Sequence, residues 1–359
     1  MAAESLPYSA LLSQALVAFT IEADNVWESE MPHRTTRYGG SPRAPYATSL
    51  RQWSNFMRVL GEGGLTVGEL ERRTRAKPQL DAMRRWGYVT IEPAPDDPRQ
   101  KPPQLEHMVV PTAAGRRAQS VWRRLPETIE ARWGERFGAS VVGDIKRILG
   151  GLRDQLGLDL PHFLTSIHGG YVGAPGDGPV EVPRDPLPLS VLLSQVLHAF
   201  ALEYEQHARA SLAFSANVLR LVGDDGADIA KLPRRSGVSI EQTRVAAGIL
   251  AKRGLLTVGS ESGAAGKRAR LTRRGFDARA LYRSFPGEIE ARWAERFGAA
   301  PVQAMRSHLE SLATPSGTEQ APLWLGLAPP PGSWRDEIRP PEVLPHFPMP
   351  RQSGHPDGA

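Results

Sequence analysis

The sequence predicts a mainly α-helical fold with small β-hairpins, built from two copies of one unit. Long segments carry apolar residues at the i, i+3, i+4 spacing of amphipathic helices. Short strand-like runs flank a glycine-rich turn, as in a β-hairpin. Several segments occur twice in the same order, which is typical of an internal repeat. The 359 residues suffice for two or three domains with cores of their own.

The repeat rests on three pairs of matching segments. Leu11–Glu22 returns as Leu192–Glu203 with eight of twelve residues identical, and Ile129–Gly138 returns as Ile289–Gly298 with nine of ten identical. Leu-Pro-His-Phe occurs at 160–163 and again at 344–347. We therefore divide the chain into four parts: repeat 1 (1–175, with an insertion at 31–47), a Pro/Gly-rich linker (176–185), repeat 2 (186–312) and a Pro-rich C-terminal segment that ends repeat 2 (313–359).

Repeat 2 gives the clearest series of elements. Its first elements are helices of apolar spacing, one of them kept short by a proline: Leu189–Gln206, Leu212–Leu221 and a brief helix from Asp228 to Pro233. Ser239 with Gln242 three residues later has the capping-box pattern. A second helix of this pair is therefore expected to begin at Ser239 and to end at Gly254.

A hairpin and further helices follow in repeat 2. Leu255–Val258 and Lys267–Thr272 have the composition of paired strands around the flexible tip Gly259–Gly266. A long helix is expected from Thr272 towards Tyr282. The remaining elements are a separate segment and a last helix: Pro286–Gly298 and Pro301–Leu312.

Repeat 1 has the same frame with departures. Thr66–Arg73 matches the first helix of the pair, and Leu80–Val89 matches the second helix and its exit into a strand. The second helix or the turn before it is shorter by five residues and contains Pro78. The hairpin segment, Glu92–Leu105, is longer and rich in proline.

A short helix, a tight turn, a capped helix and a basic hairpin follow one another in the order of a winged helix-turn-helix. Leu250-Ala-Lys-Arg-Gly-Leu-Leu at the helix exit and Arg270-Leu-Thr-Arg-Arg-Gly275 after the hairpin resemble the MarR-like winged-helix regulators of bacteria. The resemblance covers about Leu212–Leu281; the last third of each repeat carries no element of that family. It implies a mainly α fold with small β-wings, in which tandem winged helix-turn-helix modules form a pseudo-dimer.

The function implied by this resemblance is transcription regulation through double-stranded DNA, with one chain supplying both modules as a monomer or as part of a homodimer. In such proteins the second helix enters the major groove and the wing contacts the phosphate backbone or the minor groove. Glutamine pairs with adenine, and arginine with guanine. The candidate DNA-binding residues of repeat 2 are Ser239, Gln242, Arg244, Lys267, Arg268 and Arg270, with Glu241 on the same helix. Those of repeat 1 are Lys77, Gln79, Arg84 and Arg85, with Arg99 and Lys101 in its wing.

Composition leaves alternatives open. The chain has 44 Lys+Arg against 39 Asp+Glu, a net charge of +5 that permits an anionic partner without requiring one. The alternative for the candidate residues is a solvated helix face and an ordinary hairpin. A second hypothesis is a ligand-sensing or protein-interaction module with degenerate winged helices, which includes a small-molecule effector as a partner. A third is an enzyme that uses the Met31–Tyr46 insertion with His33, His162 and His346.

The enzyme hypothesis has the weakest support in the sequence. Cysteine is absent, which excludes disulfides, thiolate nucleophiles and cysteine zinc sites. No phosphate-binding loop, nucleophile elbow or paired-histidine metal motif occurs. We therefore expect no catalytic residue, no metal and no cofactor. Trp133 and Trp293 are expected to pack, including between the repeats.

The sequence also predicts a cytoplasmic protein without a membrane segment. No apolar run approaches the ~18 residues that a membrane helix needs. The N-terminus has no basic region before an apolar stretch, so it does not resemble a secretory signal.

Overall fold

The computed structural model describes residues 5–31, 50–78, 80–95, 97–164, 173, 175–176, 186–260, 266–315, 320–332 and 341–349. Most of the insertion, most of the linker, the tip of the second hairpin and Gln79 lie outside these described residues. The fold class is confirmed in its coarse form: the described chain is mainly helical and contains two small three-stranded antiparallel sheets.

The two repeats contain the same elements in the same order. Repeat 1 comprises α1 (Tyr8–Glu30), α2 (Leu50–Asn55), β1 (Leu65–Thr66), α3 (Val67–Thr74), α4 (Leu80–Arg85), β2 (Val89–Glu92), β3 (Met108–Pro111), α5 (Ala113–Phe137) and α6 (Ala139–Leu156). Repeat 2 comprises α7 (Leu189–Glu205), α8 (Leu212–Asn217), β4 (Ala227–Asp228), α9 (Leu232–Ser236), α10 (Ile240–Lys252), β5 (Leu256–Ser260), β6 (Lys267–Leu271), α11 (Arg273–Phe297) and α12 (Ala299–Ala313). Short 3-10 turns lie at Met57–Val59, Gln104–Glu106, Leu219–Leu221, Ile229–Lys231 and Pro322–Gly326.

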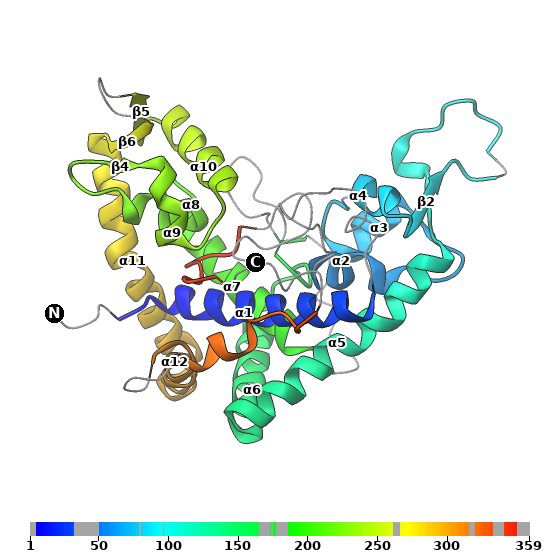
Figure 1. The fold of residues 1–359 in the computed structure, drawn as a ribbon, viewed down its shortest axis with the longest axis horizontal. Helices are drawn as coiled ribbons and strands as arrows, with labels where there is room; N and C mark the ends of the chain where they lie inside the picture. The colour runs from blue at the N-terminus through cyan, green and yellow to red at the C-terminus, as the bar shows by residue number, and fades with distance from the viewer. Residues whose placement is uncertain are drawn as a thin grey trace.

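The first and last helices of the repeats form a shared centre. α1 packs against α7 and against α12, while α6 packs against α7 and α12. The first helix of each repeat therefore contacts the last helix of the other. Figure 1 shows two lobes on one side of α1, with α6 and α12 on the opposite side. Lobe 1 (57–111) carries α3, α4 and the first sheet, and lobe 2 (219–271) carries α9, α10 and the second sheet.

The central helices are buried around most of their circumference. Consecutive residues of α1 from Tyr8 to Trp27 are buried, and so are those of α7 from Leu189 to Ala201. A helix covered on every side is a core helix rather than a surface helix. The helix predicted at Leu189–Gln206 is confirmed as α7, and the polar residues between its apolar ones as far as Ala201 are buried as well.

The predicted break before Pro286 is wrong. α11 runs without interruption through Pro286, and α5 likewise runs through Pro126. A proline inside a helix removes one backbone hydrogen bond and costs about 3 kcal/mol. The buried side chains of Phe285, Ile289 and Trp293 hold the second half of α11 against the core and offset this cost.

A third strand in each sheet was not predicted. β1 pairs with β3, and β4 pairs with β6, so the strand orders are β1-β3-β2 and β4-β6-β5. Each of these added strands has only two residues, too few to show a period in the sequence. The predicted helix Leu212–Leu221 is also divided, because Val218 leaves the helical region with φ −120° and a 3-10 turn follows.

The five-residue difference between the repeats lies between the left-handed turn residue and the glycine after the second helix, because Gly87 is 12 residues after Arg75 and Gly254 is 17 residues after Gly237. α4 has 6 residues, whereas its counterpart α10 has 13. The residue after α3, Arg75, takes the left-handed conformation that Gly237 takes after α9. The turns therefore correspond, and of the two predicted alternatives, a shorter helix or a shorter turn, the structure has the shorter helix.

A close approach of α11 to the residue before β5 gives a stability test. A Cβ on Gly275 would lie 2.0 Å from the carbonyl oxygen of Leu255, whereas a Cβ on Gly287, in the same helix, would meet nothing within 4 Å. Gly275→Ala should lower the free energy of unfolding by about 1–3 kcal/mol. Gly287→Ala is the matched control and should raise it by about 0.5–1 kcal/mol. Chemical denaturation measures both, and equal effects of the two substitutions would contradict the close approach of α11 to Leu255.

Candidate nucleic-acid interface

The helix pair of repeat 2 is built by local signals. α9 ends at Ser236, and Gly237 with φ 75° reverses the chain. Ser239 caps α10, because its Oγ accepts a hydrogen bond from the backbone N–H of Gln242 at 3.2 Å. Gly254, with φ 70°, follows the end of α10. The predicted cap and end of this helix are confirmed.

The exposed face of α10 is a mixed stripe. Glu241 and Arg244 are exposed, and so are Gly248 and Lys252 one and two turns later. Val245, beside Arg244, is 49% exposed. These positions follow the i, i+3, i+4 spacing and therefore share one side of the helix. Arg244 thus lies where a partner of α10 would meet it. Gln242 is only partly buried, beside the cap.

The hairpin of repeat 2 divides its three cations between two faces. Successive residues of a strand point to opposite sides, so Arg268 and Arg270 share one face and Lys267 lies on the other. Arg268 donates from Nη2 to the carbonyl oxygen of Asp225 at 3.1 Å. A Cβ on Gly226 would lie 2.9 Å from Cγ of Arg270, so the stem of Arg270 crosses this glycine.

These contacts place the three hairpin cations in different environments. Arg268 is partly buried, and Asp228 of β4 lies opposite it in the sheet register. Lys267 and Arg270 are exposed. Arg268 therefore helps to hold β6 against the adjoining strand and turn, while Lys267 and Arg270 present charge to solvent.

Sequence reasoning missed further cations beside this helix pair. Arg234 and Arg235 lie in the last turn of α9, and Arg273 and Arg274 are the first two residues of α11; all four are exposed. The doubled arginines were visible in the sequence. Their placement beside α10 and the hairpin depends on the fold, since neither pair belongs to the second helix or to the wing.

Repeat 1 presents fewer side chains. Lys77, Arg84 and Arg85 are exposed, and Arg84 lies 3.4 Å from a carboxylate oxygen of Asp81 one turn earlier. Gln79 lies outside the described residues. Six residues make fewer than two turns, so α4 offers a smaller surface than α10.

The hairpin cation Arg99 of repeat 1 is paired within its own loop. Its guanidinium bonds both carboxylate oxygens of Asp97, at 2.6 Å from Nη2 to Oδ2, and also contacts Glu106. The Arg99 hydrogen bonds lower the pKa of Asp97 to about 2. Lys101 is exposed. This hairpin therefore presents less positive charge than that of repeat 2.

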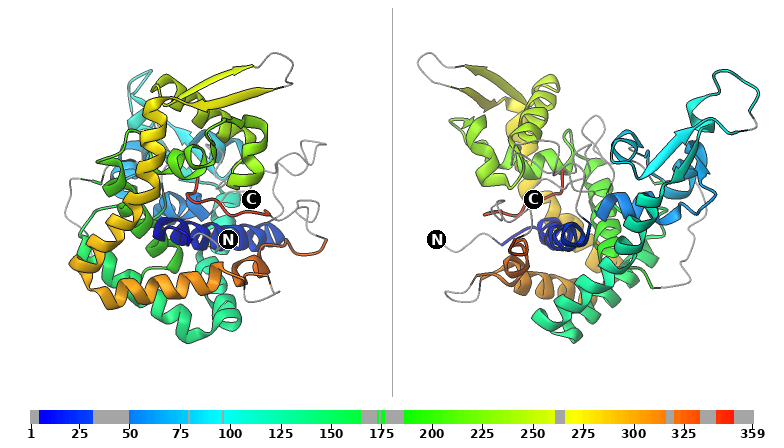
Figure 2. Two further views of the ribbon diagram at one scale, coloured as in Figure 1. Left: turned by 90° about the vertical axis from the view of Figure 1, so that its left-hand side faces the viewer. Right: turned by 45° about the vertical axis from the view of Figure 1, so that its right-hand side comes forward.

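The two lobes project to the same side of the central helices. Figure 1 and the right view of Figure 2 place α10 with the β5–β6 hairpin in one lobe and α4 with β2 in the other, at opposite ends of the long dimension. One elongated partner lying along this side would meet both lobes.

The two repeated histidines are partly buried in separate segments of the chain. His162 and His346 lie in different Leu-Pro-His-Phe segments, and burial lowers the pKa of each to about 3, so both are neutral at pH 7. Nδ1 of His346 lies 3.3 Å from the hydroxyl of Tyr282, at hydrogen-bond distance. His33 lies outside the described residues. Within the described part of the chain, no group of three or more His, Cys, Asp or Glu residues is placed to hold a metal ion.

The repeated tryptophans pack, as predicted. Trp133 and Trp293 are each 1% exposed, and their indole N–H groups donate to Glu22 and Glu203 at 2.9 and 2.7 Å. Trp293 also meets Tyr8 of repeat 1 edge to face, with ring centroids 6.3 Å apart. The packing role therefore extends between the repeats.

The chain matches no protein-family model, no curated protein and no solved structure. Of the helices in the described ranges, none has the length and apolar character needed to cross a bilayer.

Proposed function

We propose that this protein is a DNA-binding transcriptional regulator of MarR-like type in which one chain supplies two winged helix-turn-helix modules as a pseudo-dimer. The observation that carries the proposal is the order of elements in lobe 2: a left-handed turn at Gly237, the capped helix α10 and then a basic hairpin. A second lobe of the same design projects on the same side of the central helices. In this proposal α10 and α4 are the reading helices.

The sheet topology supports this proposal. The strand before the helix pair joins the hairpin as its third strand, giving the order β4-β6-β5 in lobe 2 and β1-β3-β2 in lobe 1. This third strand fixes the hairpin beside the second helix. A helix aimed at the major groove and a cationic hairpin at the adjacent phosphates then approach DNA together.

The two modules are unequal, and this difference suggests a separate role for each. α10 is long, capped and followed by the exposed hairpin cations Lys267 and Arg270, whereas α4 is short and Arg99 is held by Asp97 and Glu106. Repeat 2 therefore specifies sequence, and repeat 1 adds affinity. The preferred site is asymmetric rather than palindromic.

Phosphate binding predicts a salt dependence. Log affinity for a DNA duplex should fall linearly with log salt, and Lys267→Ala should flatten that slope by about one. Arg147→Ala is the matched control, because it removes an exposed cation from α6, on the side away from the lobes. Fluorescence anisotropy over a salt series measures the slopes. Equal slopes for native protein and both variants would contradict phosphate contact by the hairpin.

Base reading predicts a difference between the repeats. Arg244→Ala or Gln242→Ala should relax discrimination at one half-site by about 1–3 kcal/mol. Arg84→Ala should weaken binding with little change in base preference. Selection of bound fragments from random DNA shows both effects. A changed selected sequence for Arg84→Ala alone would reverse the assignment, and no binding by the native protein would remove the proposed function.

A second candidate function, ligand sensing by repeat 1, has an observation of its own. The buried amide of Gln52 and the indole N–H of Trp122 have no hydrogen-bond partner among the residues that the structure describes. Trp122 stacks on Trp27, with ring centroids 5.2 Å apart. Phe214 and Tyr282 stand at the matching positions of repeat 2, so the fold does not require the polar atoms at 52. We infer from these unpartnered groups that the ligand class is a planar aromatic carboxamide, whose amide would pair with Gln52 and whose ring would stack on a tryptophan.

This candidate is tested with benzamide as the probe. Benzamide should raise the melting temperature of the native protein, and Gln52→Leu should abolish that rise. The substitution itself should stabilise the ligand-free protein, because it removes a buried polar group that lacks a partner. Phe214→Leu in repeat 2 is the control and should leave any benzamide effect in place. A native protein that benzamide does not stabilise would count against this ligand class.

A further inference from the structure

The two Leu-Pro-His-Phe segments have no part in the proposed DNA contacts, yet both are docked in the interior. We name them strap 1 (159–164) and strap 2 (343–349). We propose that each strap is a brace that fixes the orientation of its own lobe against the first helix of the other repeat. Its use in DNA reading rests on the proposed function, whereas the mechanical coupling does not.

Each strap is held first by an asparagine at the base of its own lobe. The amide of Asn55, at the end of α2, donates to the carbonyl oxygen of Phe163 at 2.9 Å and accepts from the N–H of the same residue at 2.8 Å. Asn217, at the end of α8, donates to the carbonyl oxygen of Phe347 at 2.8 Å and accepts from the N–H of His346 at 3.2 Å. Both asparagines are fully buried.

Each strap also touches the turn that precedes the proposed reading helix. A Cβ on Gly237 would lie 2.2 Å from the carbonyl oxygen of Val343, so strap 2 passes directly against the turn between α9 and α10. In repeat 1 the matching turn residue is Arg75. Its Nε donates to Asp159 of strap 1 at 2.5 Å. Each strap therefore contacts the turn before the second helix of its own repeat, through a backbone approach in repeat 2 and an ion pair in repeat 1.

The third attachment of each strap crosses to the other repeat. Ser13 of α1 donates to the carbonyl oxygen of Pro345 at 2.8 Å, and Gln14 donates to that of Leu344 at 3.4 Å. In the reverse direction, Ser194 of α7 accepts from the N–H of Leu164 at 2.8 Å, and Gln195 donates to the carbonyl oxygen of Leu160 at 3.0 Å. The repeated Ser-Gln pair therefore binds the strap of the opposite repeat.

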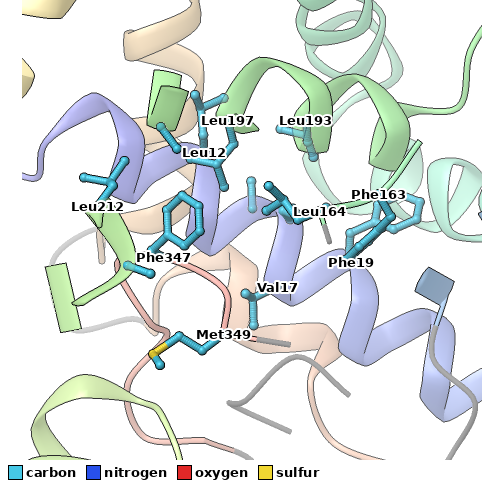
Figure 3. Close-up of a cluster of buried hydrophobic side chains, with 14 of the residues drawn as sticks. Leu12, Val17, Phe19, Phe163, Leu164, Leu193, Leu197, Leu212, Phe347 and Met349 are labelled. Atoms are coloured by element: carbon cyan, nitrogen blue, oxygen red, sulfur yellow. The ribbon is translucent and has the colours of Figure 1, made fainter. Parts of the chain in front are cut away.

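Apolar packing adds to these hydrogen bonds. Figure 3 shows Phe347 among Leu12, Leu197 and Leu212, and Phe163 beside Phe19. These neighbours come from α1, α7 and α8. A lobe that turned relative to the centre would have to withdraw a buried aromatic ring and break buried hydrogen bonds, so the strap resists that motion.

This geometry predicts an effect across the repeats. Ser13 belongs to repeat 1 but holds strap 2, so Ser13→Ala should loosen lobe 2 and leave lobe 1 in place. Ser194→Ala should loosen lobe 1 and leave lobe 2 in place. If a strap only contributed to overall stability, the same substitution would destabilise the whole fold and would not affect one lobe more than the other.

The experiment measures distances between spin labels, which the absence of native cysteine makes simple. One label pair, Lys252→Cys with Ser307→Cys, joins α10 to α12; another, Arg85→Cys with Ser140→Cys, joins α4 to α6. All four positions are exposed. Ser13→Ala should broaden or shift the distance distribution of the first pair alone, and Ser194→Ala that of the second pair alone.

Matched controls exist at equivalent positions. Ser9 and Ser190 are fully buried serines of α1 and α7, and neither Oγ has a hydrogen-bond partner among the described residues. Ser9→Ala and Ser190→Ala should leave both distributions unchanged. If a serine variant does not fold, Gln14→Ala and Gln195→Ala carry the same crossed test. Unchanged distributions in folded strap variants, or equal loosening of both lobes, would overturn the brace.

DNA selection then gives a separate readout. The strap variants should tolerate a wider range of half-site spacings than the native protein while keeping its base preferences. If the native protein selects no DNA, the proposed function fails, but the crossed distance result still stands or falls on its own.

Discussion

The structure depends on the mutual burial of α1 and α7. Each is apolar around most of its circumference and cannot be covered by its own repeat alone, so α1 requires α7 and α12, and α7 requires α6. Burial of this much apolar surface is the dominant favourable term in folding. It also fixes the arrangement of the lobes, because both lobes are attached to these two helices and to the long helices that follow them.

Burying two such helices leaves polar groups that must be satisfied, and the repeats solve this in parallel ways. Glu22 accepts from Trp133 and pairs with Arg136, while Glu203 accepts from Trp293 and pairs with Arg292. The Ser-Gln pairs instead take their partners from the opposite straps. Contacts in which each half supplies the same groups to the other are the pattern of an isologous interface. Here both halves belong to one chain.

Because both repeats belong to one chain, their sequences can differ from each other. A homodimer must present two identical faces, whereas these repeats differ in the second helix and the hairpin of their lobes. Repeat 2 keeps a 13-residue α10 and exposed Lys267, and repeat 1 has a 6-residue α4 and an internally paired Arg99. The straps also diverge at their outer contact, where Arg75 and Asp159 replace the close approach of Gly237 and Val343. The central contacts are the parts that both copies retain.

The sequence by itself determined the features that neighbouring residues control. The repeat, the Ser239 cap, the end of α10 near Gly254 and the paired strands β5 and β6 all follow from local patterns, because helix ends and tight turns are set within a few residues. The sequence also showed that repeat 1 is five residues shorter around Pro78, in the second helix or in the turn before it. Only the tertiary structure decided the rest. Pro286 stays inside α11 because its flanking side chains are buried, and the two-residue strands β1 and β4 exist only through pairing with β3 and β6. Likewise, Ser13 and Pro345 stand far apart in the chain, and no local pattern indicates that one bonds the other. Such contacts arise when the core brings distant segments together and a buried polar group must find a partner there.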